Sequence, residues 1–249
     1  MQLTVIGTGS AGNAYLLQAG SGNDALLLDA GISSTKIIRA ARGLRNVKGC
    51  LVTHEHGDHI TGAKKLAEMG VKVYATAGTL TAAGIDRAMP CIRVAEYLKP
   101  IECGSFTILP FQTQHDAQQP CGYIIRSRET GETLLYATDT YYLRNTFPGI
   151  NYWLIECNYV DEITNQMMAD GELPETMRNR LLGSHMSLRR LKDTLAANDL
   201  TPARKIVLCH LSDERSDERR MVSEIASITG KETIAALNGM VIDLSLTPF

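Results

Sequence analysis

The residues best suited to chemistry are gathered in one short segment, His54-Glu55-His56-Gly57-Asp58-His59. An apolar stretch at Gly49–Thr53 predicts a strand before it, and Ile60–Met69 predicts a helix after it. Imidazoles two residues apart on extended backbone can face one metal ion, and Asp58 and His59 can face a neighbouring position as the chain turns. These nitrogen and carboxylate donors suit Zn²⁺, and also Mn²⁺ or Fe²⁺. The segment therefore predicts a metal site.

The other three of the chain's six histidines also lie in predicted loops. His115 and His210 each follow a predicted strand, and Asp139 ends another strand in the same way. His185 is expected in a loop with glycine and serine that precedes a helix. Strand ends that gather on one edge of a layered sheet would bring these groups together. One histidine alone is more often a hydrogen-bonded residue, but the whole set favours a metal centre.

A glycine motif near the start, Gly7-Thr8-Gly9-Ser10-Ala11-Gly12, matches the dinucleotide-binding pattern, and Asp29 stands close to where an acidic ribose ligand belongs. That fingerprint must open a helix, and only Asn13–Ala19 separates these glycines from the next glycine turn. We therefore reject a dinucleotide site and favour a hairpin turn. The backbone N–H groups of Gly9–Asn13 can also form a concave anion site, which makes Ser10 and Asn13 candidate substrate-binding residues.

The elements that must position these groups are short. Strands are predicted at Leu3–Ile6, Ala14–Gln18, Ala25–Asp29, Gly49–Thr53, Val71–Tyr74, 92–97, 105–112, 121–127, 133–138, Trp153–Cys157, Lys205–Cys209, 232–237 and 240–244. Helices are predicted at Ser34–Leu44, Ile60–Met69, Thr79–Gly84, 161–169, 174–182, 187–197 and 216–228. Hairpin strands come first and helices alternate with strands later, which indicates a layered α/β domain with mixed sheets.

Composition excludes several classes of protein. With 44% hydrophobic and 21% charged residues, the 249-residue chain is neither disordered nor fibrous. Its formal net charge of −2 argues against coating nucleic acid by bulk charge. No apolar stretch of membrane-spanning length and no secretion signal are visible, so no membrane association is expected. The six cysteines form no CxxC pair, which favours reduced thiols in a cytoplasmic protein.

Taken together, these motifs resemble the metallo-β-lactamase fold family. The segment THEHGDHITG, YATDT at 136–140, SHMS at 184–187 and LCHLSDE at 208–214 look most like YycJ/WalJ-type nucleases, with ribonuclease Z more distant. The resemblance covers nearly the whole chain. It implies one domain over residues 1–249 with an αββα four-layer sandwich, and a centre of two divalent metal ions, for which zinc is favoured over manganese or iron.

The resemblance also implies which residues do what. By motif position, His54, His56 and His115 would hold one metal ion. Asp58, His59 and His210 would hold the other, and Asp139 would bridge them. His185 matches the non-ligand histidine that hydrolases similar to ribonuclease Z place beside the scissile phosphate.

The chemistry expected of this set is hydrolysis of a phosphate ester. Two metal ions can stabilise a bridging hydroxide as nucleophile and neutralise phosphoryl oxygens. Asp58 can accept a proton or orient the nucleophile, and His185 can act as general acid or as imidazolium. Ser184 and Ser187 either orient His185, and so help to bind substrate, or cap helices.

The leading interpretation is a metal-dependent phosphodiesterase, a nuclease acting on DNA or RNA. Tyr159 stands where similar sequences often carry a histidine, which leaves the role of that loop open. The short spacing between Asp139 and His185 leaves no room for a β-CASP domain, and no arm of the tRNA-processing kind is evident. Alternatives are hydrolysis of small cyclic nucleotides, hydrolysis of a lactam, lactone or thioester, and a binding protein without activity, which the complete ligand set disfavours. An oligomer stays open.

Overall fold

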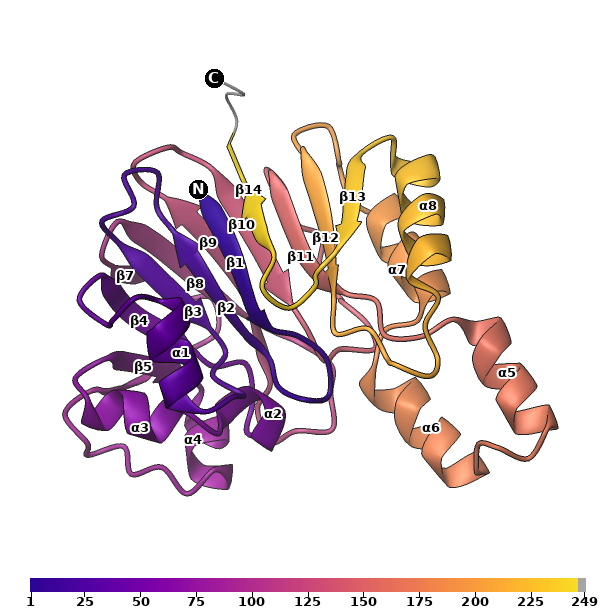
Figure 1. The fold of residues 1–249 in the computed structure, drawn as a ribbon, viewed down its shortest axis with the longest axis horizontal. Coiled ribbons are helices and arrows are strands. Elements are labelled where there is room, and N and C mark those ends of the chain that lie inside the picture. Colours follow the sequence, from indigo (N-terminus) through magenta and orange to yellow (C-terminus); the bar gives the residue numbers. More distant parts are fainter. Residues whose placement is uncertain (246–249) are drawn as a thin grey trace. The chain divides into compact units, whose positions relative to one another are not determined.

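A computed structural model of the chain describes residues 1–245, which group into two compact units (Figure 1). The first unit comprises residues 1–112, 117–133 and the segment from Leu237 onwards. The second comprises Thr113–Asp116 and Leu134–Ala236. Each unit is described by itself, and the expectation of one domain over the whole chain stays a prediction.

The first unit is built on a mixed sheet whose strand order is β14-β1-β2-β3-β4-β5-β6. Its strands are β1 (Gln2–Gly7), β2 (Ala14–Gln18), β3 (Ala25–Leu28), β4 (Val47–Leu51), β5 (Lys72–Ala75), β6 (Ile92–Val94) and β14 (Val241–Asp243). The pairs from β14 to β3 are antiparallel, and those from β3 to β6 are parallel. Each of these strands overlaps a predicted one.

Helices cover one face of this sheet. They are α1 (Ser34–Ala40), α2 (Gly57–Ile60), α3 (Ala63–Glu68) and α4 (Ala77–Ala82). In β3, Ala25 and Leu27 belong to the core cluster that the helices close, while Leu26 and Leu28 are buried outside that cluster. The parallel strands are therefore buried on both sides, which matches their nearly continuous apolar sequences.

Two predicted helices in this unit are too long, for reasons of backbone geometry. The helix predicted over Ser34–Leu44 ends at Ala40 because Arg42 and Gly43 adopt left-handed backbone, with φ of 53° and 100°. The helix predicted over Ile60–Met69 is replaced by α2 and α3, which Gly62 separates. A side chain at Gly62 would lie 2.7 Å from the carbonyl oxygen of Ile32, so the chain passes too closely there for any other residue.

An antiparallel set of strands completes the first unit: β7 (Ile101–Cys103), β8 (Phe106–Gln112) and β9 (Cys121–Ser127). The three-residue strand β7 was not predicted, because so short a segment carries no clear alternation. Strand β9 is tied to the end of β4. The Cys121 N–H donates to the Thr53 carbonyl at 3.0 Å, and the Tyr123 hydroxyl donates to the Val52 carbonyl at 2.7 Å.

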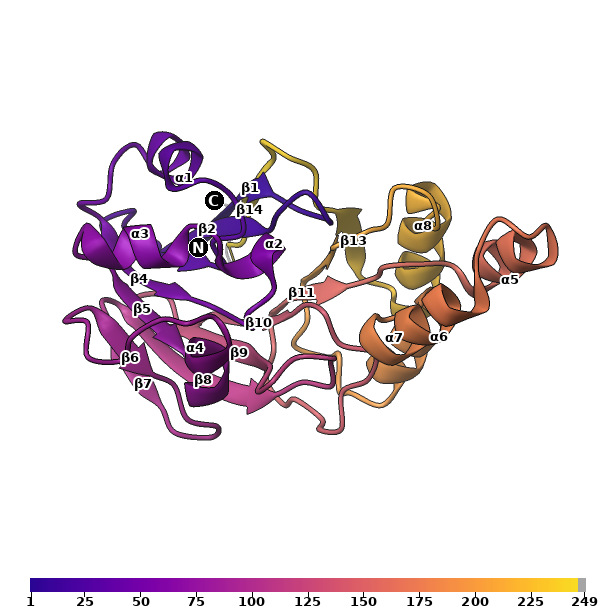
Figure 2. The same ribbon diagram turned by 90° about the horizontal axis from the view of Figure 1, so that it is seen from below.

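The second unit contains four parallel strands in the order β10-β11-β12-β13. They are β10 (Thr133–Ala137), β11 (Tyr152–Glu156), β12 (Lys205–Cys209) and β13 (Glu232–Ala235), with helices α5 (Asp161–Ala169), α6 (Glu175–Ser184), α7 (Leu188–Ala196) and α8 (Glu218–Thr229). Figure 1 shows α7 and α8 beside β12 and β13, and Figure 2 shows α8 beside β13. The apolar face of α7 carries Leu188, Leu191 and Leu195, all buried.

The expected glycine- and serine-containing loop around His185 is not a loop on its N-terminal side. Gly183 and Ser184 form the last turn of α6, and His185 follows in extended conformation with φ of −128°. The sequence LLGS was too weakly patterned to extend the predicted helix from 182 to 184.

Two expectations from composition can be compared with the structure. All six cysteines lie within the described residues, and all are free thiols. Among residues 1–245, none of the helices combines the length and apolar character that a membrane crossing requires.

Candidate functional site

The first unit brings three histidines of the predicted segment together. His54 follows β4, while His56 and His59 flank the start of α2, whose first turn also carries Asp58. The ring centroid of His54 lies 4.6 Å from that of His56 and 4.2 Å from that of His59. His54 and His59 are buried, so these imidazoles form a compact cluster of nitrogen donors at the end of a rigid strand.

His59 is oriented by a carboxylate that the sequence analysis had considered only as a ribose ligand. Its Nδ1 lies 2.8 Å from Oδ2 of Asp29, and both side chains are fully buried. Asp29 also accepts the backbone N–H of Thr53 at 2.8 Å. With Nδ1–H donating to Asp29, Nε2 of His59 carries the lone pair, and it lies 3.5 Å from Oδ2 of Asp58. This is the arrangement by which carboxylates orient metal-binding histidines.

The glycine turn near the start supports the same segment. Strand β2 begins at Ala14, two residues after Gly12, so no helix opens there, which confirms the rejection of a dinucleotide fingerprint. The buried Asn13 donates its amide N–H to the Gly9 carbonyl at 3.1 Å, and its backbone N–H to the Asp58 carbonyl at 2.7 Å. Asn13 therefore holds the Asp58–His59 corner in place, whereas Ser10 is exposed.

Close backbone packing fixes that corner as well. A side chain at Gly31 would overlap the carbonyl oxygen of Asp58, and a side chain at Gly12 would overlap the carbonyl oxygen of Gly31. Gly12 has a φ of +131°, which L residues rarely adopt. Gly12 and Gly31 therefore allow three stretches of chain to meet behind the histidine cluster.

In the second unit, His115 is oriented by a backbone carbonyl. Its Nδ1–H donates to the carbonyl oxygen of Ser184 at 2.9 Å, which leaves Nε2 as the nitrogen with the lone pair. That Nε2 lies 3.6 Å from Oδ2 of Asp139 and 3.3 Å from Oδ1 of Asp116. Burial lowers the pKa of His115, so the neutral, ligating form is favoured.

Glu156, the last residue of β11, is a buried hub that the sequence analysis missed. Its Oε1 accepts Nδ1–H of His185 at 2.7 Å and lies 3.2 Å from Nδ1 of His210. Its Oε2 accepts the backbone N–H groups of Thr140 at 2.9 Å and of Met186 at 3.2 Å. The signal that could have found it is topological: parallel strand ends meet at one edge, and β11 lies beside β10, after which Asp139 follows.

The charges of Glu156 and His185 stabilise each other. Burial by itself would raise the pKa of Glu156, but the neighbouring His185 holds it below its ordinary value. Burial would likewise lower the pKa of His185, but the Glu156 carboxylate raises it above its ordinary value. His185 is 22% exposed, so a proton on its ring is stabilised and can still reach the surface.

Four side chains of the second unit form one donor group. Ligand atoms of Asp139, Glu156, His185 and His210 all lie within 4.8 Å of one another. The rings of His185 and His210 are stacked, with centroids 5.4 Å apart. Asn158 donates its amide N–H to the His210 carbonyl at 2.8 Å, which anchors this loop.

Three acidic or imidazole residues at strand ends adopt left-handed backbone: Asp29, Asp139 and His210, with φ of 56°, 48° and 54°. This conformation is costly for residues other than glycine, and it is retained mainly where the surroundings enforce it. In each case a strand has just ended, and the conformation turns the side chain out of the strand direction.

The two serines near His185 make contacts that shape the local structure. Ser187 is the N-cap of α7, where its hydroxyl accepts the Arg190 N–H at 3.3 Å, as the capping alternative predicted. Ser184 contributes the carbonyl that orients His115. Neither contact tests a role in binding substrate.

Both units thus present the imidazole and carboxylate donors that divalent zinc binds, with the Nδ1 atoms of His59 and His115 already used on oxygen acceptors. This donor chemistry fits the binding of divalent metal ions.

Comparisons with known proteins identify the family of this chain. Residues 25–211 match the family model described as "Beta-lactamase superfamily domain". Exodeoxyribonuclease WalJ of Streptococcus pneumoniae is 28% identical over 242 residues, covering 91% of this chain and 85% of that protein. Exodeoxyribonuclease YycJ of Bacillus anthracis is 29% identical over 249 residues, covering 92% and 90%.

Solved structures show the same fold. The metallo-β-lactamase fold protein YhfI from Bacillus subtilis aligns with a TM-score of 0.74 at 19% identity, covering 97% of this chain and 98% of that one. Zn²⁺-bound PqqB from Methylobacterium extorquens aligns with a TM-score of 0.73 at 16% identity, covering 98% and 100%. The expected metallo-β-lactamase sandwich is confirmed, and the chain belongs to the beta-lactamase superfamily.

Proposed function

We propose that this protein is a metal-dependent nuclease that hydrolyses phosphodiester bonds in DNA. The observation that carries the proposal is the His185–Glu156 pair at 2.7 Å, in the same donor group as Asp139 and His210. A stabilised imidazolium beside candidate metal ligands suits a reaction in which an alkoxide leaves and must be protonated. The exodeoxyribonuclease names of relatives that cover about nine-tenths of the chain support the same reaction.

The proposed ligand assignment follows the motifs. His54, His56 and His115 would hold one divalent cation, Asp58, His59 and His210 would hold the second, and Asp139 would serve both. Zinc is the favoured metal because the set is rich in imidazole, and the Zn²⁺-bound relative in fold supports it; manganese and iron are the alternatives. When bound, such a pair of cations activates water and neutralises charge on the phosphoryl oxygens.

The chain's own residues complete the reaction. His185, protonated and held at Nδ1 by Glu156, offers its Nε2–H to the leaving 3′ or 5′ oxygen of the substrate. Asp58 orients the attacking water or accepts its proton. Asp29 and the Ser184 carbonyl keep His59 and His115 in the tautomer that presents Nε2.

One substrate panel tests the proposal. The purified protein, supplied with Zn²⁺ or Mn²⁺, is incubated with linear duplex DNA, single-stranded DNA, RNA, cyclic mononucleotides, a lactam and a thioester. Release of nucleotides from DNA, abolished by a chelator and restored by metal, is the expected result.

Other outcomes would overturn specific parts of the proposed function. Turnover of cyclic mononucleotides with intact polymers would replace the nuclease by a small-molecule phosphodiesterase. Cleavage of the lactam or thioester alone would reject phosphodiester chemistry, and cleavage of RNA with intact DNA would change the assigned polymer.

A further inference from the structure

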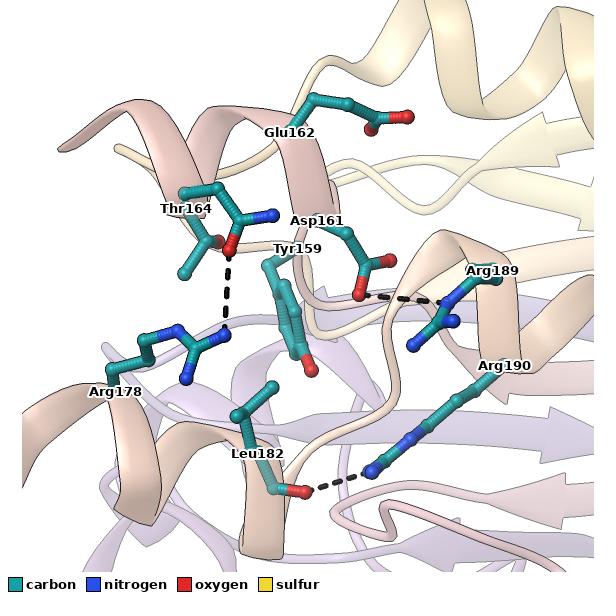
Figure 3. A pocket seen from close by; sticks show the side chains of 9 residues that line it. Tyr159, Asp161, Glu162, Thr164, Arg178, Leu182, Arg189 and Arg190 are labelled. Carbon is teal, nitrogen blue, oxygen red and sulfur yellow. Dashed lines mark hydrogen bonds and ion pairs between the residues drawn. The ribbon is translucent and has the colours of Figure 1, made fainter. Parts of the chain in front are cut away.

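A second feature of the second unit lies outside the donor group: a pocket of about 380 Å³ beside α5, α6 and the start of α7 (Figure 3). Three arginines line it: Arg178, Arg189 and Arg190. Tyr159 and two acids from the first turn of α5, Asp161 and Glu162, line it as well. Guanidinium groups that converge on one small pocket are suited to binding phosphate.

Two of these guanidinium groups are held in place by neutral oxygens. Arg190 donates to the carbonyl oxygens of Leu182 at 2.6 Å and of Tyr141 at 3.3 Å. Its guanidinium carbon lies 5.3 Å from the centre of the Tyr141 ring. Arg178 donates to the side-chain oxygen of Asn165 at 3.4 Å. Within residues 1–245, neither Arg178 nor Arg190 has a carboxylate within ion-pair distance, so no close negative charge offsets theirs.

The acids of the pocket do not cancel this charge. Glu162 lies 3.1 Å from a guanidinium nitrogen of Arg220, which does not line the pocket. Asp161 is 3.9 Å from Arg189, whose side chain is 74% exposed, so this ion pair is long and screened by water. Three arginines therefore face one carboxylate that is only loosely paired and one that is paired elsewhere.

The backbone connects this pocket to the donor group. The Asn158 N–H donates to the Met186 carbonyl at 2.8 Å, and the Leu188 N–H donates to the Tyr159 carbonyl at 2.9 Å. These bonds hold two segments side by side. Along one segment, Asn158 anchors His210 and Tyr159 lines the pocket; along the other, His185 is followed four residues later by Arg189.

Tyr159 connects the pocket to the donor group, because it lines the pocket and directly follows Asn158 in the chain. In Figure 3 its ring lies between Arg178 on one side and Arg190 on the other. Burial raises the pKa of Tyr159, so its hydroxyl stays protonated and is able to donate a hydrogen bond. The structure therefore places a hydrogen-bond donor in the wall of an arginine-lined pocket.

We propose that this pocket binds a backbone phosphate of the nucleic acid substrate, one that neighbours the scissile phosphate at His185. The inference rests on the proposed function. Arg178, Arg189 and Arg190 supply the charge, and the Tyr159 hydroxyl supplies a neutral donor. Because the contact is to phosphate and not to a base edge, it raises affinity for any sequence.

The test compares two double variants that remove the same charge. Arg178→Gln with Arg189→Gln removes charge from the pocket and leaves Arg190, which braces two carbonyls, in place. Arg204→Gln with Arg219→Gln removes charge from two exposed positions of the same unit that do not line the pocket. Both are compared with the wild-type holoenzyme.

Binding is measured by fluorescence anisotropy with a labelled single-stranded DNA whose linkages are phosphorothioate, across a salt series. The pocket variant is expected to bind at least tenfold more weakly than the control variant, with a salt slope smaller by about 1. Equal binding by the two variants would overturn the inference.

Kinetics separate this inference from the proposed function. On DNA, the pocket variant is expected to show a KM raised about tenfold, while kcat/KM on bis(4-nitrophenyl) phosphate, a diester with no neighbouring phosphate, stays at the control value. A matching loss on the small diester would place the arginines in the chemical step and reject the inference. If the wild type cleaves no diester yet the pocket variant still binds DNA more weakly, the proposed function fails and the phosphate site stands.

A competition arm distinguishes a free nucleotide from a strand. Thymidine monophosphate and inorganic phosphate are expected to displace the DNA only at millimolar concentration. Tight binding of either one, lost in the pocket variant and without effect on DNA affinity, would identify a nucleotide site and contradict the inference.

Discussion

Each unit contains a buried carboxylate that holds Nδ1 of a histidine, and the two pairs differ in exposure. In the first unit, Asp29 contacts His59 at 2.8 Å and neither side chain is exposed. In the second, Glu156 contacts His185 at 2.7 Å, and His185 is 22% exposed. The contact is nearly the same, but only one of the two imidazoles can exchange a proton with solvent or substrate.

The same local contact can therefore serve two tasks. A fully enclosed pair fixes the orientation and tautomer of an imidazole, which suits a metal ligand. A pair open on one side stabilises a proton that can still be transferred, which suits a general acid. We therefore propose that His59 binds metal and that His185 transfers a proton, and the following experiments test that division.

Removing a proposed ligand is expected to have the largest effect. In His59→Ala or His210→Ala, metal content should fall from two equivalents to about one, and cleavage of DNA should fall by about 10³-fold or more, because the cation clamp is incomplete. Elemental analysis after dialysis and initial rates provide the measurement. Full metal content together with full activity in either variant would remove that residue from the centre.

His185→Ala is expected to lower kcat by about 10²–10⁴-fold with metal content unchanged, since only the proton donor is lost. A substrate with a good leaving group, such as a 4-nitrophenyl ester, should lose much less. Loss of metal in this variant would instead make His185 a ligand, which the shared donor group with Asp139 and His210 also allows.

Substitutions of the two orienting carboxylates are expected to have smaller effects, one on metal affinity and the other on kcat. Asp29→Asn is expected to weaken metal affinity by about 10–100-fold with little change in kcat at saturating metal. Glu156→Gln should leave metal affinity nearly unchanged and lower kcat, because it destabilises the protonated His185. The same pattern in both variants would contradict the proposed division between binding and proton transfer.

The pH dependence is the finest test. In the metal-free protein, the pKa of His185 is raised above 6.5, so its contribution to stability is present below pH 6.5 and is lost as pH rises through the raised pKa. The pKa of Glu156 is lowered below 4.5, so its contribution is present above pH 4.5 and is lost as pH falls through the lowered pKa. The pair should therefore stabilise the fold most between about pH 4.5 and 6.5.

Urea unfolding in the presence of a chelator measures this window. The difference in unfolding free energy between the wild type and Glu156→Gln is expected to be largest near pH 5.5 and to shrink toward pH 9. Proton NMR of the His185 ring should show a lower pKa in the variant. An unchanged His185 pKa would show that Glu156 does not stabilise the imidazolium.

The sequence located the candidate functional residues better than it predicted the contacts that orient them. Strand ends could be located at His54, Asp139 and His210 because apolar runs stop there. The partners Asp29 and Glu156 could not be assigned, because a carboxylate at a strand end becomes an orienting group only through its neighbours in space. Nor could periodicity reveal Gly62, where close approach of Ile32 divides a helix.

We propose that histidines and carboxylates of this chain hold two metal ions. Anomalous diffraction at the zinc edge, from crystals of the zinc-loaded protein, tests this claim most directly. We predict two peaks, one about 2.0–2.1 Å from the ligating nitrogens of His54, His56 and His115 and the other at the same distance from His59 and His210, with Asp139 contacting both. Crystals with no peak at these residues, or with zinc bound only elsewhere, would contradict it.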